Sequence, residues 1–260
     1  TRNASLARNE GELADADKEQ LAAIASNLKK QAPNSFEANM ARFHLEFPAR
    51  SAFTALGAAA ATDPSRPELL GPQLARAMMD GNDANIQAAC RALDNRGSIS
   101  QALLDVATDL LLSIDPNGIV FTNGEMDSYP TLVRQRVFGV RKDVLVIDQR
   151  MLADAAYRQH VWGRAQAGGA PPITTEAFIK TLLNATTRPV FLALSLDPAF
   201  AKSLEGELYA TGIALRYSHQ RVDNLNDLAA RWSRMNKNLY AGPLSANYLL
   251  PGVVLLKHYR

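Results

Sequence analysis

Cysteine is nearly absent from this chain, which holds a single thiol at Cys90, so no disulfide can join two parts of it. The residues around it, 85–93, show an apolar helical pattern with no histidine nearby. We therefore predict that Cys90 is a small buried core residue and not a nucleophile. A chain with one thiol suits a cytoplasmic as well as a periplasmic location.

Long hydrophobic runs are also missing. A membrane-spanning helix needs about 18 or more apolar residues, and the longest candidates, 190–196 and 248–256, are much shorter. We expect no membrane span in this chain. It starts at Thr1 without a methionine or a targeting segment, so we expect a mature or excised piece of a longer protein.

An excess of one charge is missing too, because 28 basic and 26 acidic residues leave a net charge of only +2. Nucleic-acid-binding proteins usually show a stronger basic excess on one face, so we predict no nucleic-acid partner. A hydrophobic content of 47% and a charged content of 21% are typical of a globular protein with a core.

Helical patterns fill residues 14–94. The first apolar stripe has the spacing of an amphipathic helix and consists of Leu13, Leu21, Ile24, Ala25 and Leu28. Breaks at 33–35, 63–67 and 81–83 separate the later helices. Turns that recur about every 30 to 34 residues resemble those of tetratricopeptide repeats. An irregular helical bundle is the alternative.

After Gly97 the pattern alternates between helices and short apolar runs bounded by turn residues. The predicted helices are 98–113, 129–138, 151–163 and 174–185, and the predicted strands are 119–122, 143–148, 188–194 and 212–217. This alternation is typical of βαβ units, which form a parallel sheet covered on both faces.

The predicted fold class is therefore α/β with three parts. Residues 1–95 form an α-helical hairpin region, and 96–222 form a Rossmann-like parallel domain of about four strands. Residues 223–260 form two C-terminal helices.

Polar residues follow each predicted strand. Ligands of open parallel sheets bind outside the carboxyl ends of the strands. These ends are followed by 123–130, by Asp148 and Gln149, by Ser195 and Asp197, and by Ser218 and His219. If all four strands are parallel, these groups share one rim. The predicted ligand-binding residues are Asn123, Gly124, Glu125, Asp127, Ser128, Asp148 and Asp197, and none is assigned a catalytic role.

The first of these loops carries most of the information. Gly124 permits a tight turn, Asp127 or Ser128 can cap the next helix, and Pro130 lies near the start of that helix. Free N–H groups at a helix start favour an anionic or hydroxyl-rich ligand. Glu125 and Asp127 are also suited to a hard cation such as Mg²⁺. A purely structural loop, with Asp127 as a cap, remains the third interpretation.

Other chemical signatures are absent or weak. The chain has no dinucleotide fingerprint, phosphate loop or nucleophile elbow, and its four histidines lack metal-ligand spacing. We predict neither a cofactor nor a metal. A basic stretch around the second predicted strand consists of Arg134, Arg136, Arg141, Lys142 and Arg150. We predict that it forms a solvated face, and anion contact by Arg141 or Arg150 is the alternative.

One segment resembles a motif of large multi-pass membrane proteins, the family that includes transmembrane protein O-mannosyltransferases and bacterial relatives of unknown function. The matching residues are Ile119-Val-Phe-Thr-Asn-Gly-Glu-Met-Asp-Ser-Tyr-Pro130, then Gln135, Gly139-Val-Arg141 and Asp143-Val144. A looser similarity covers Arg188-Pro-Val-Phe191 and 209–216. Glu125 stands where those proteins usually carry Asp.

The resemblance implies an extracytoplasmic tail domain flanked by tetratricopeptide-like helices. In that family the transferase chemistry belongs to the membrane part, which this chain lacks. Three hypotheses follow. The first is a non-catalytic binding or assembly module that meets a protein partner through its N-terminal helical region and holds a small polar or glycan ligand at the rim. The second is a transferase or hydrolase using Glu125 or Asp127, and the third is a purely structural scaffold.

Overall fold

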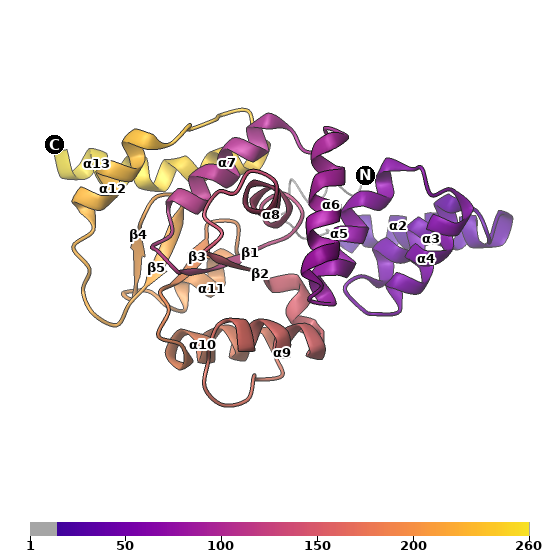
Figure 1. Ribbon diagram of the computed structural model, residues 1–260, viewed down its shortest axis with the longest axis horizontal. Coiled ribbons are helices and arrows are strands. Elements are labelled where there is room, and N and C mark those ends of the chain that lie inside the picture. Colours follow the sequence, from indigo (N-terminus) through magenta and orange to yellow (C-terminus); the bar gives the residue numbers. More distant parts are fainter. Residues whose placement is uncertain (1–14, 260) are drawn as a thin grey trace.

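The computed structural model describes residues 15–259, and its first part is a set of packed helices (Figure 1). These are α2 (Asp15–Gln31), α3 (Phe36–Glu46), α4 (Ala52–Thr62), η1 (Pro67–Leu69), α5 (Leu70–Met79) and α6 (Asp83–Asn95). Helix α3 packs on α4, and α5 packs on α6. The predicted hairpin region thus consists of helices, and its part in residues 1–14, with Leu13, lies outside the described residues.

A five-stranded sheet follows. Its strands are β1 (Ile119–Thr122), β2 (Leu145–Asp148), β3 (Val190–Ala193), β4 (Leu208–Ala210) and β5 (Ala214–Tyr217), in the order β2-β1-β3-β5-β4. Helices α7 (Gln101–Leu112) and α8 (Ser128–Arg136) lie on one side of it, and α9 (Ala155–Arg164) and α10 (Thr175–Ala185) on the other (Figure 1). The 3₁₀ helix η2 (Gln149–Ala153) links β2 to α9. The α/β fold class is confirmed.

The expectation that all strands are parallel is wrong. Strand β1 pairs in parallel with β2 and β3, whereas β5 runs antiparallel to β3 and to β4. A parallel strand after β3 would need a crossover of a dozen or more residues. Residues 194–207, which include the short helix α11 (Pro198–Lys202), supply such a crossover, because β4 is antiparallel to β5 and therefore runs in the same direction as β3. The tight hairpin between β4 and β5 then reverses the chain, so β5 runs opposite to both of its neighbours.

The residues of the three parallel strands are buried on both sides. All four positions of β1, β2 and β3 are buried, as expected where helices cover both faces. Most buried apolar side chains between Phe36 and Tyr248 belong to one cluster, which extends from the N-terminal helices through the sheet to the C-terminal segment. The division into three parts at 95 and 222 stays a prediction.

Cys90 belongs to this core, as predicted. Its side chain is fully buried, and burial raises the pKa of its thiol to about 12. A thiol with so high a pKa holds almost no thiolate at neutral pH and is a poor nucleophile.

The C-terminal segment consists of α12 (Leu225–Arg234), η3 (Gly242–Tyr248) and α13 (Leu249–Tyr259), so the predicted helices are present. The buried carboxylate of Asp109 on α7 fixes this segment. It accepts hydrogen bonds from the N–H of Asn236 (2.9 Å), the N–H of Lys237 (2.9 Å) and the hydroxyl of Tyr248 (2.6 Å). Nδ2 of Asn236 donates to it as well, at 3.0 Å, so one side chain satisfies four donors from a segment more than 120 residues away in sequence.

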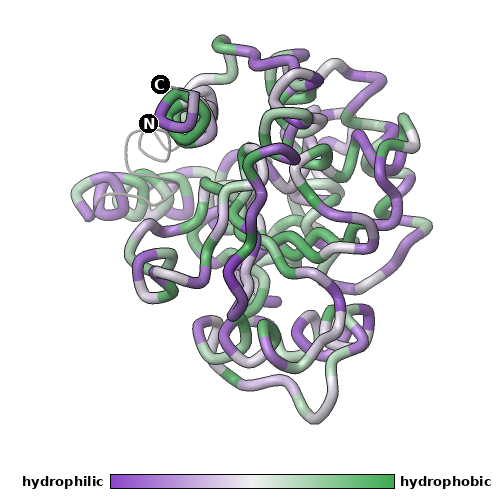
Figure 2. Tube along the Cα trace, turned by 90° about the vertical axis from the view of Figure 1, so that its left-hand side faces the viewer, coloured by the Kyte–Doolittle hydropathy of each residue, from purple (hydrophilic) through white to green (hydrophobic). Residues whose placement is uncertain are grey.

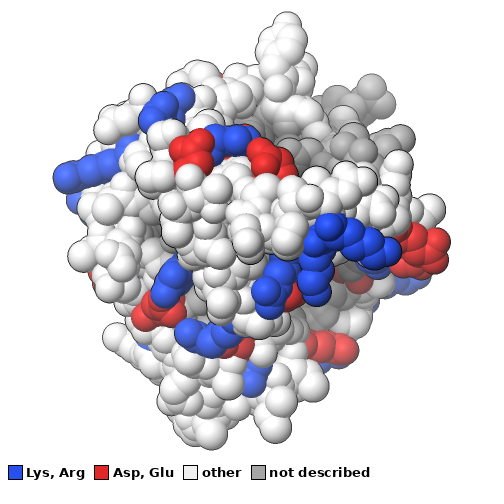
Figure 3. All heavy atoms as spheres, turned by 90° about the vertical axis from the view of Figure 1, so that its right-hand side faces the viewer, with Lys and Arg blue, Asp and Glu red and all other residues white. Residues whose placement is uncertain are grey.

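Charges of both signs lie side by side on one face of the molecule. The face that the N-terminal helices present shows Lys and Arg next to Asp and Glu (Figure 3). This mixture differs from the single-sign field that nucleic-acid binding usually requires.

Candidate functional site

The carboxyl ends of β1, β2 and β3 meet at one rim of the sheet. Thr122 and Asp148, the last residues of β1 and β2, are register partners. Ser195 follows β3 by two residues, and its carbonyl accepts a hydrogen bond from Nδ2 of Asn123 at 2.9 Å. The structure therefore places Asn123, Asp127, Asp148 and Ser195 around the same edge, as parallel strands require.

Asp127 lies at the centre of this rim with only 5% of its surface exposed. Both of its carboxylate oxygens accept from the N–H of Asn123, at 2.9 and 3.1 Å. The hydroxyl of Ser195 donates to Oδ2 of the same carboxylate. The carboxylate thus closes its own loop and ties it to the segment after β3.

The environment of Asp127 disfavours its charged form. Burial raises its pKa from 3.8 to about 6, and the nearby Asp148 adds to this shift. The hydrogen bonds from Ser195 and Asn123 oppose the rise without cancelling it. Perturbed carboxyl groups of this kind occur at functional sites and also in structural networks.

Asp148 is fully buried and paired with Arg150. The guanidinium lies 3.2 Å (Nε to Oδ1) and 3.0 Å (Nη2 to Oδ2) from the carboxylate, and the N–H of Arg150 donates to Oδ1 at 3.1 Å. The hydroxyl of Tyr157 accepts from the N–H of Asp148 at 3.1 Å. This two-point contact is the geometry in which Arg binds a carboxylate most firmly.

Gly124 allows Arg150 to take this position. Gly124 has φ = +102°, a conformation that side chains disfavour, and a Cβ atom there would lie 2.8 Å from Cζ of Arg150. The prediction of a glycine turn is therefore correct, and close approach of Arg150 is a second requirement for it.

The other predicted site residues, Ser128, Asp197 and Glu125, each have contacts of their own. The hydroxyl of Ser128 is buried and forms a hydrogen bond with that of Thr122 at 2.7 Å. Asp197 is exposed and caps α11 by accepting from the N–H of Ala199 at 2.8 Å. The side chain of Glu125 is 40% exposed, with Oε1 4.0 Å from Nη1 of Arg150.

Two local predictions are wrong. Asp127 occupies the N-cap position of α8, but neither it nor Ser128 caps the helix, because the carboxylate of Asp127 instead binds the preceding loop. Ser218 and His219 are absent from the rim, since β5 is antiparallel and ends at the opposite edge of the sheet. There, the ring nitrogens of His219 lie 2.6 Å from Glu207 and 2.7 Å from Asn184.

The sequence placed Ser195 beside the rim without counting it as a site residue, and it suggested Arg150 only as an anion contact, so the bonds of both residues to the rim carboxylates were missed. Ser195 directly follows the third predicted strand, and this position was the available signal. The basic residues are mostly engaged within the chain and do not form a simple solvated face. Arg141, for example, donates to the carbonyls of Leu111 and Ile114 at 3.0 and 2.7 Å.

The chemistry open to this rim is limited. Ser195 and Asp127 form one hydroxyl–carboxylate pair, and a pKa near 6 suits a general base. Within residues 15–259, no three or more His, Cys, Asp or Glu side chains gather in a way that could hold a metal ion.

Among the described helices, none combines the length and apolarity needed to cross a membrane.

Comparison with known proteins gives one match. No curated protein and no solved structure matches the chain. Residues 103–178, which run from α7 through β1, α8, β2 and α9 into α10, match the family model described as TMEM260-associated domain 2. The central part of this chain, including the loop of Asp127 and the Asp148–Arg150 pair, is therefore similar to a domain associated with a membrane protein.

Proposed function

We propose that this chain is a non-catalytic binding and assembly module that accompanies envelope or glycan-related membrane machinery outside the cytoplasm. The proposal rests on the hydrogen bonds and ion pairs that the rim carboxylates already form within the chain. Asp127 is bound by Asn123 and Ser195, and Asp148 by Arg150, so both are used to hold the loops together. A site built for a polar ligand would keep such groups directed toward an open cavity.

The link to membrane machinery has two supports. The match to TMEM260-associated domain 2 covers the segment that contains the rim loop. The same segment carries the Thr122-Asn-Gly-Glu-Met-Asp127 run that resembles the tail of transmembrane O-mannosyltransferases. In those proteins the transferase chemistry lies in the membrane part, so a tail of this kind would have a supporting role.

A protein partner would dock on the C-terminal helix α13, in place of the N-terminal helical region that the sequence favoured. Helix α13 exposes Leu249 (69%), Val253 (46%) and Leu256 (51%), which are spaced by four and three residues and so form a stripe along the helix. Figure 2 looks onto the side of the molecule where α13 ends at the label C, with hydrophobic residues along the helix. The partner that fits is an amphipathic helix of the membrane machinery, whose apolar face would cover this stripe.

The docking proposal is tested by flotation of the chain with native membrane vesicles from its source. We expect the wild-type chain to float with the vesicles, and a variant with Leu249, Val253 and Leu256 changed to Ser to stay behind. Vesicles stripped of exposed protein by protease should bind neither. Equal binding of both chains, or binding that survives protease treatment, contradicts docking of a protein helix on α13. If untreated vesicles bind neither chain, the hypothesis of a purely structural scaffold is favoured.

A second candidate function is hydrolysis or group transfer, which the Ser195–Asp127 pair favours. Asp127 would then act as the base that activates the hydroxyl of Ser195. Labelling with a fluorophosphonate probe, followed by mass spectrometry of the modified peptide, tests this chemistry. We expect no labelling of Ser195. Labelling that Asp127→Asn abolishes while the fold persists would establish the enzyme instead.

A further inference from the structure

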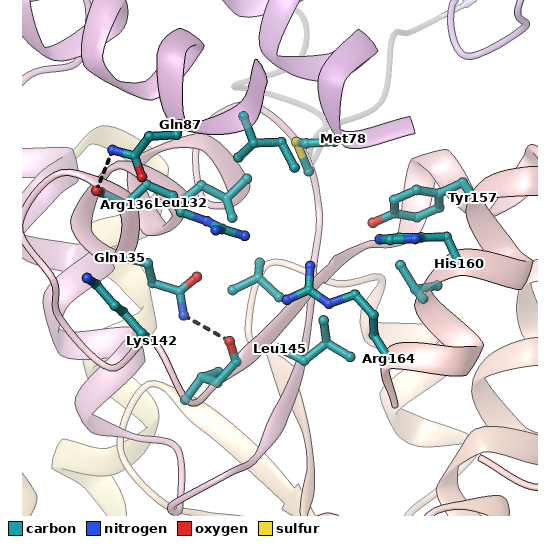
Figure 4. A pocket seen from close by; sticks show the side chains of 14 residues that line it. Met78, Gln87, Leu132, Gln135, Arg136, Lys142, Leu145, Tyr157, His160 and Arg164 are labelled. Atoms are coloured by element: carbon teal, nitrogen blue, oxygen red, sulfur yellow. Dashed lines mark hydrogen bonds between the residues drawn. The ribbon is translucent and has the colours of Figure 1, made fainter. Parts of the chain in front are cut away.

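A pocket away from the rim lies between the helical region and the outer edge of the sheet. Its volume is about 160 Å³, and its apolar floor comes from α5, α6, α8, β2 and α9 through residues such as Met78, Leu132 and Leu145 (Figure 4). It is formed where the edge strand β2 faces the N-terminal helices.

Basic side chains from three segments line this pocket, with that of Lys142 at its border and directed away from the other two (Figure 4). Arg136 ends α8, Arg164 ends α9, and Lys142 lies in the turn before β2. Figure 4 shows Arg136 and Arg164 reaching from opposite sides toward the same space. Helix C-termini favour cations, but this effect alone does not direct two guanidinium groups toward each other.

One carboxylate offsets these three cations. Oδ1 of Asp83 lies 2.5 Å from Nη2 of Arg136 and 3.7 Å from Nη1 of Arg164. Lys142 makes no ion pair within residues 15–259. Three positive charges against one negative charge leave an excess of two at the mouth of the pocket, which favours an anion.

The edge of β2 adds a backbone group to the pocket. Successive peptides of a strand point to opposite sides, and the N–H of Leu145 points inward to the carbonyl of Gly118. The backbone N–H and C=O groups of residues 144, 146 and 148 therefore point to the open edge of the sheet. The carbonyl of Val144 accepts from Gln135 at 2.9 Å, and the N–H of Asp148 donates to Tyr157 at 3.1 Å.

Val146 lies between these two capped positions. It is 8% exposed and lines the pocket, and its outward peptide has no such side-chain partner within residues 15–259. Buried peptide groups are almost always paired. The pocket therefore combines an outward N–H and C=O with convergent cations.

His160 completes the wall near Arg164. Its ring packs against the α5–α6 turn, where a Cβ on Gly81 would lie 2.7 Å from the imidazole. Burial and the charge of Arg164 lower the pKa of His160, with Asp83 opposing. A neutral imidazole can donate one hydrogen bond and accept another.

We propose that this pocket binds a phosphate monoester, with Arg136 and Arg164 on the phosphate, Lys142 adding positive charge at the border and the Val146 peptide binding an oxygen of the ligand. At about 30 Å³ per water, the pocket holds roughly five waters, which is room for a phosphate group and little more. The rest of the ligand would extend outward. This site is separate from the rim and uses none of the groups around Asp127.

Calorimetric titration of the full chain with glycerol 3-phosphate tests the proposal at constant ionic strength. A second arm measures co-sedimentation with phosphatidylcholine vesicles that contain phosphatidic acid. Saturable binding of the soluble compound identifies a free phosphate ester, and binding only to the vesicles identifies a lipid headgroup. Binding in neither arm overturns the proposal.

Four variants locate the binding. Arg164→Gln should weaken affinity about tenfold or more, because it loses a charge-assisted hydrogen bond. Lys142→Gln should weaken it less, because it removes only a nearby positive charge. Lys202→Gln, an exposed cation on α11, should leave affinity unchanged. Asp83→Asn should strengthen binding several-fold, because it removes the opposing charge.

The Asp83 variant separates ligand binding from structural damage, since damage would weaken binding. Unchanged or weaker binding by Asp83→Asn, or equal losses in Lys202→Gln and Arg164→Gln, would overturn the site. The outcome leaves the proposed assembly role untouched, because that role is tested on α13 and Ser195.

Discussion

Replacing Asp127 by Asn should make the protein relatively more stable as the pH rises. Asn has nearly the shape of the protonated carboxyl group and cannot ionise. Its carbonyl oxygen can still accept from the N–H of Asn123, which now lies 2.9 and 3.1 Å from the two carboxylate oxygens. The substitution therefore removes the charge and keeps most of the packing.

The magnitude follows from the pKa of Asp127, which burial raises from 3.8 in the unfolded chain to about 6 in the fold. Between these values the folded protein binds more protons than the unfolded chain, so stability falls as pH rises. A difference of 2.2 pH units corresponds to a limiting loss of about 3 kcal/mol, most of it between pH 4 and pH 7.

Urea unfolding of both proteins at pH 4, 5, 6 and 7 measures this effect. The stability of the wild type relative to Asp127→Asn should fall by about 2 kcal/mol or more across this range. Asp143→Asn is the control, because hydrogen bonding by Arg141 lowers the pKa of Asp143 to about 2. Its stability difference should stay nearly constant from pH 5 to pH 7. A difference for Asp127→Asn that is constant or grows with pH would refute the reasoning.

Three further substitutions test the contacts around the rim and the C-terminal segment. Gly124→Ala should cost about 1 to 3 kcal/mol in urea unfolding, because of its positive φ and the nearby guanidinium of Arg150. Arg150→Met should cost about 3 to 5 kcal/mol, since the fully buried carboxylate of Asp148 loses its partner, and a smaller loss would show that the ion pair is not essential. Asp109→Ala should speed amide hydrogen exchange in α12 and α13 while the sheet stays protected, because Tyr248 and two backbone N–H groups lose their acceptor. Uniform exchange throughout the chain would show that the C-terminal segment is not a separate unit.

The local patterns of this sequence predict its elements well. The strands at 119–122 and 143–148 and the helix at 174–185 are present with shifts of no more than two residues. Apolar runs bounded by turn residues are sufficient for this, because burial of a strand on two faces leaves a continuous apolar pattern.

The direction of a strand could not be predicted from the local sequence pattern. The run at 212–217 has the composition of a buried strand whether it lies parallel or antiparallel. Its direction depends on β4, a strand that the sequence did not predict, because the β4–β5 hairpin turns β5 antiparallel to β3. The expectation for His219 failed for this reason.

The hydrogen-bond partners of the candidate site residues could not be predicted from the sequence either. The sequence predicted that Asn123, Asp127 and Asp148 lie near the same rim, and the structure brings them together. It could not show that Asp127 binds Ser195, 68 residues later, instead of capping α8. Long-range hydrogen bonds of this kind leave no periodicity in the sequence.

The central claim is that the rim around Asp127 holds the loops together and binds no ligand. A thermal-shift screen tests it most directly, with wild type and Asp127→Asn compared against divalent metals, sugars, nucleotide sugars and phosphates. We predict that every compound shifts the two proteins equally, including any phosphate that binds beside Arg164. A compound that raises the melting temperature of the wild type but leaves that of Asp127→Asn unchanged would contradict the claim and make the rim a binding site.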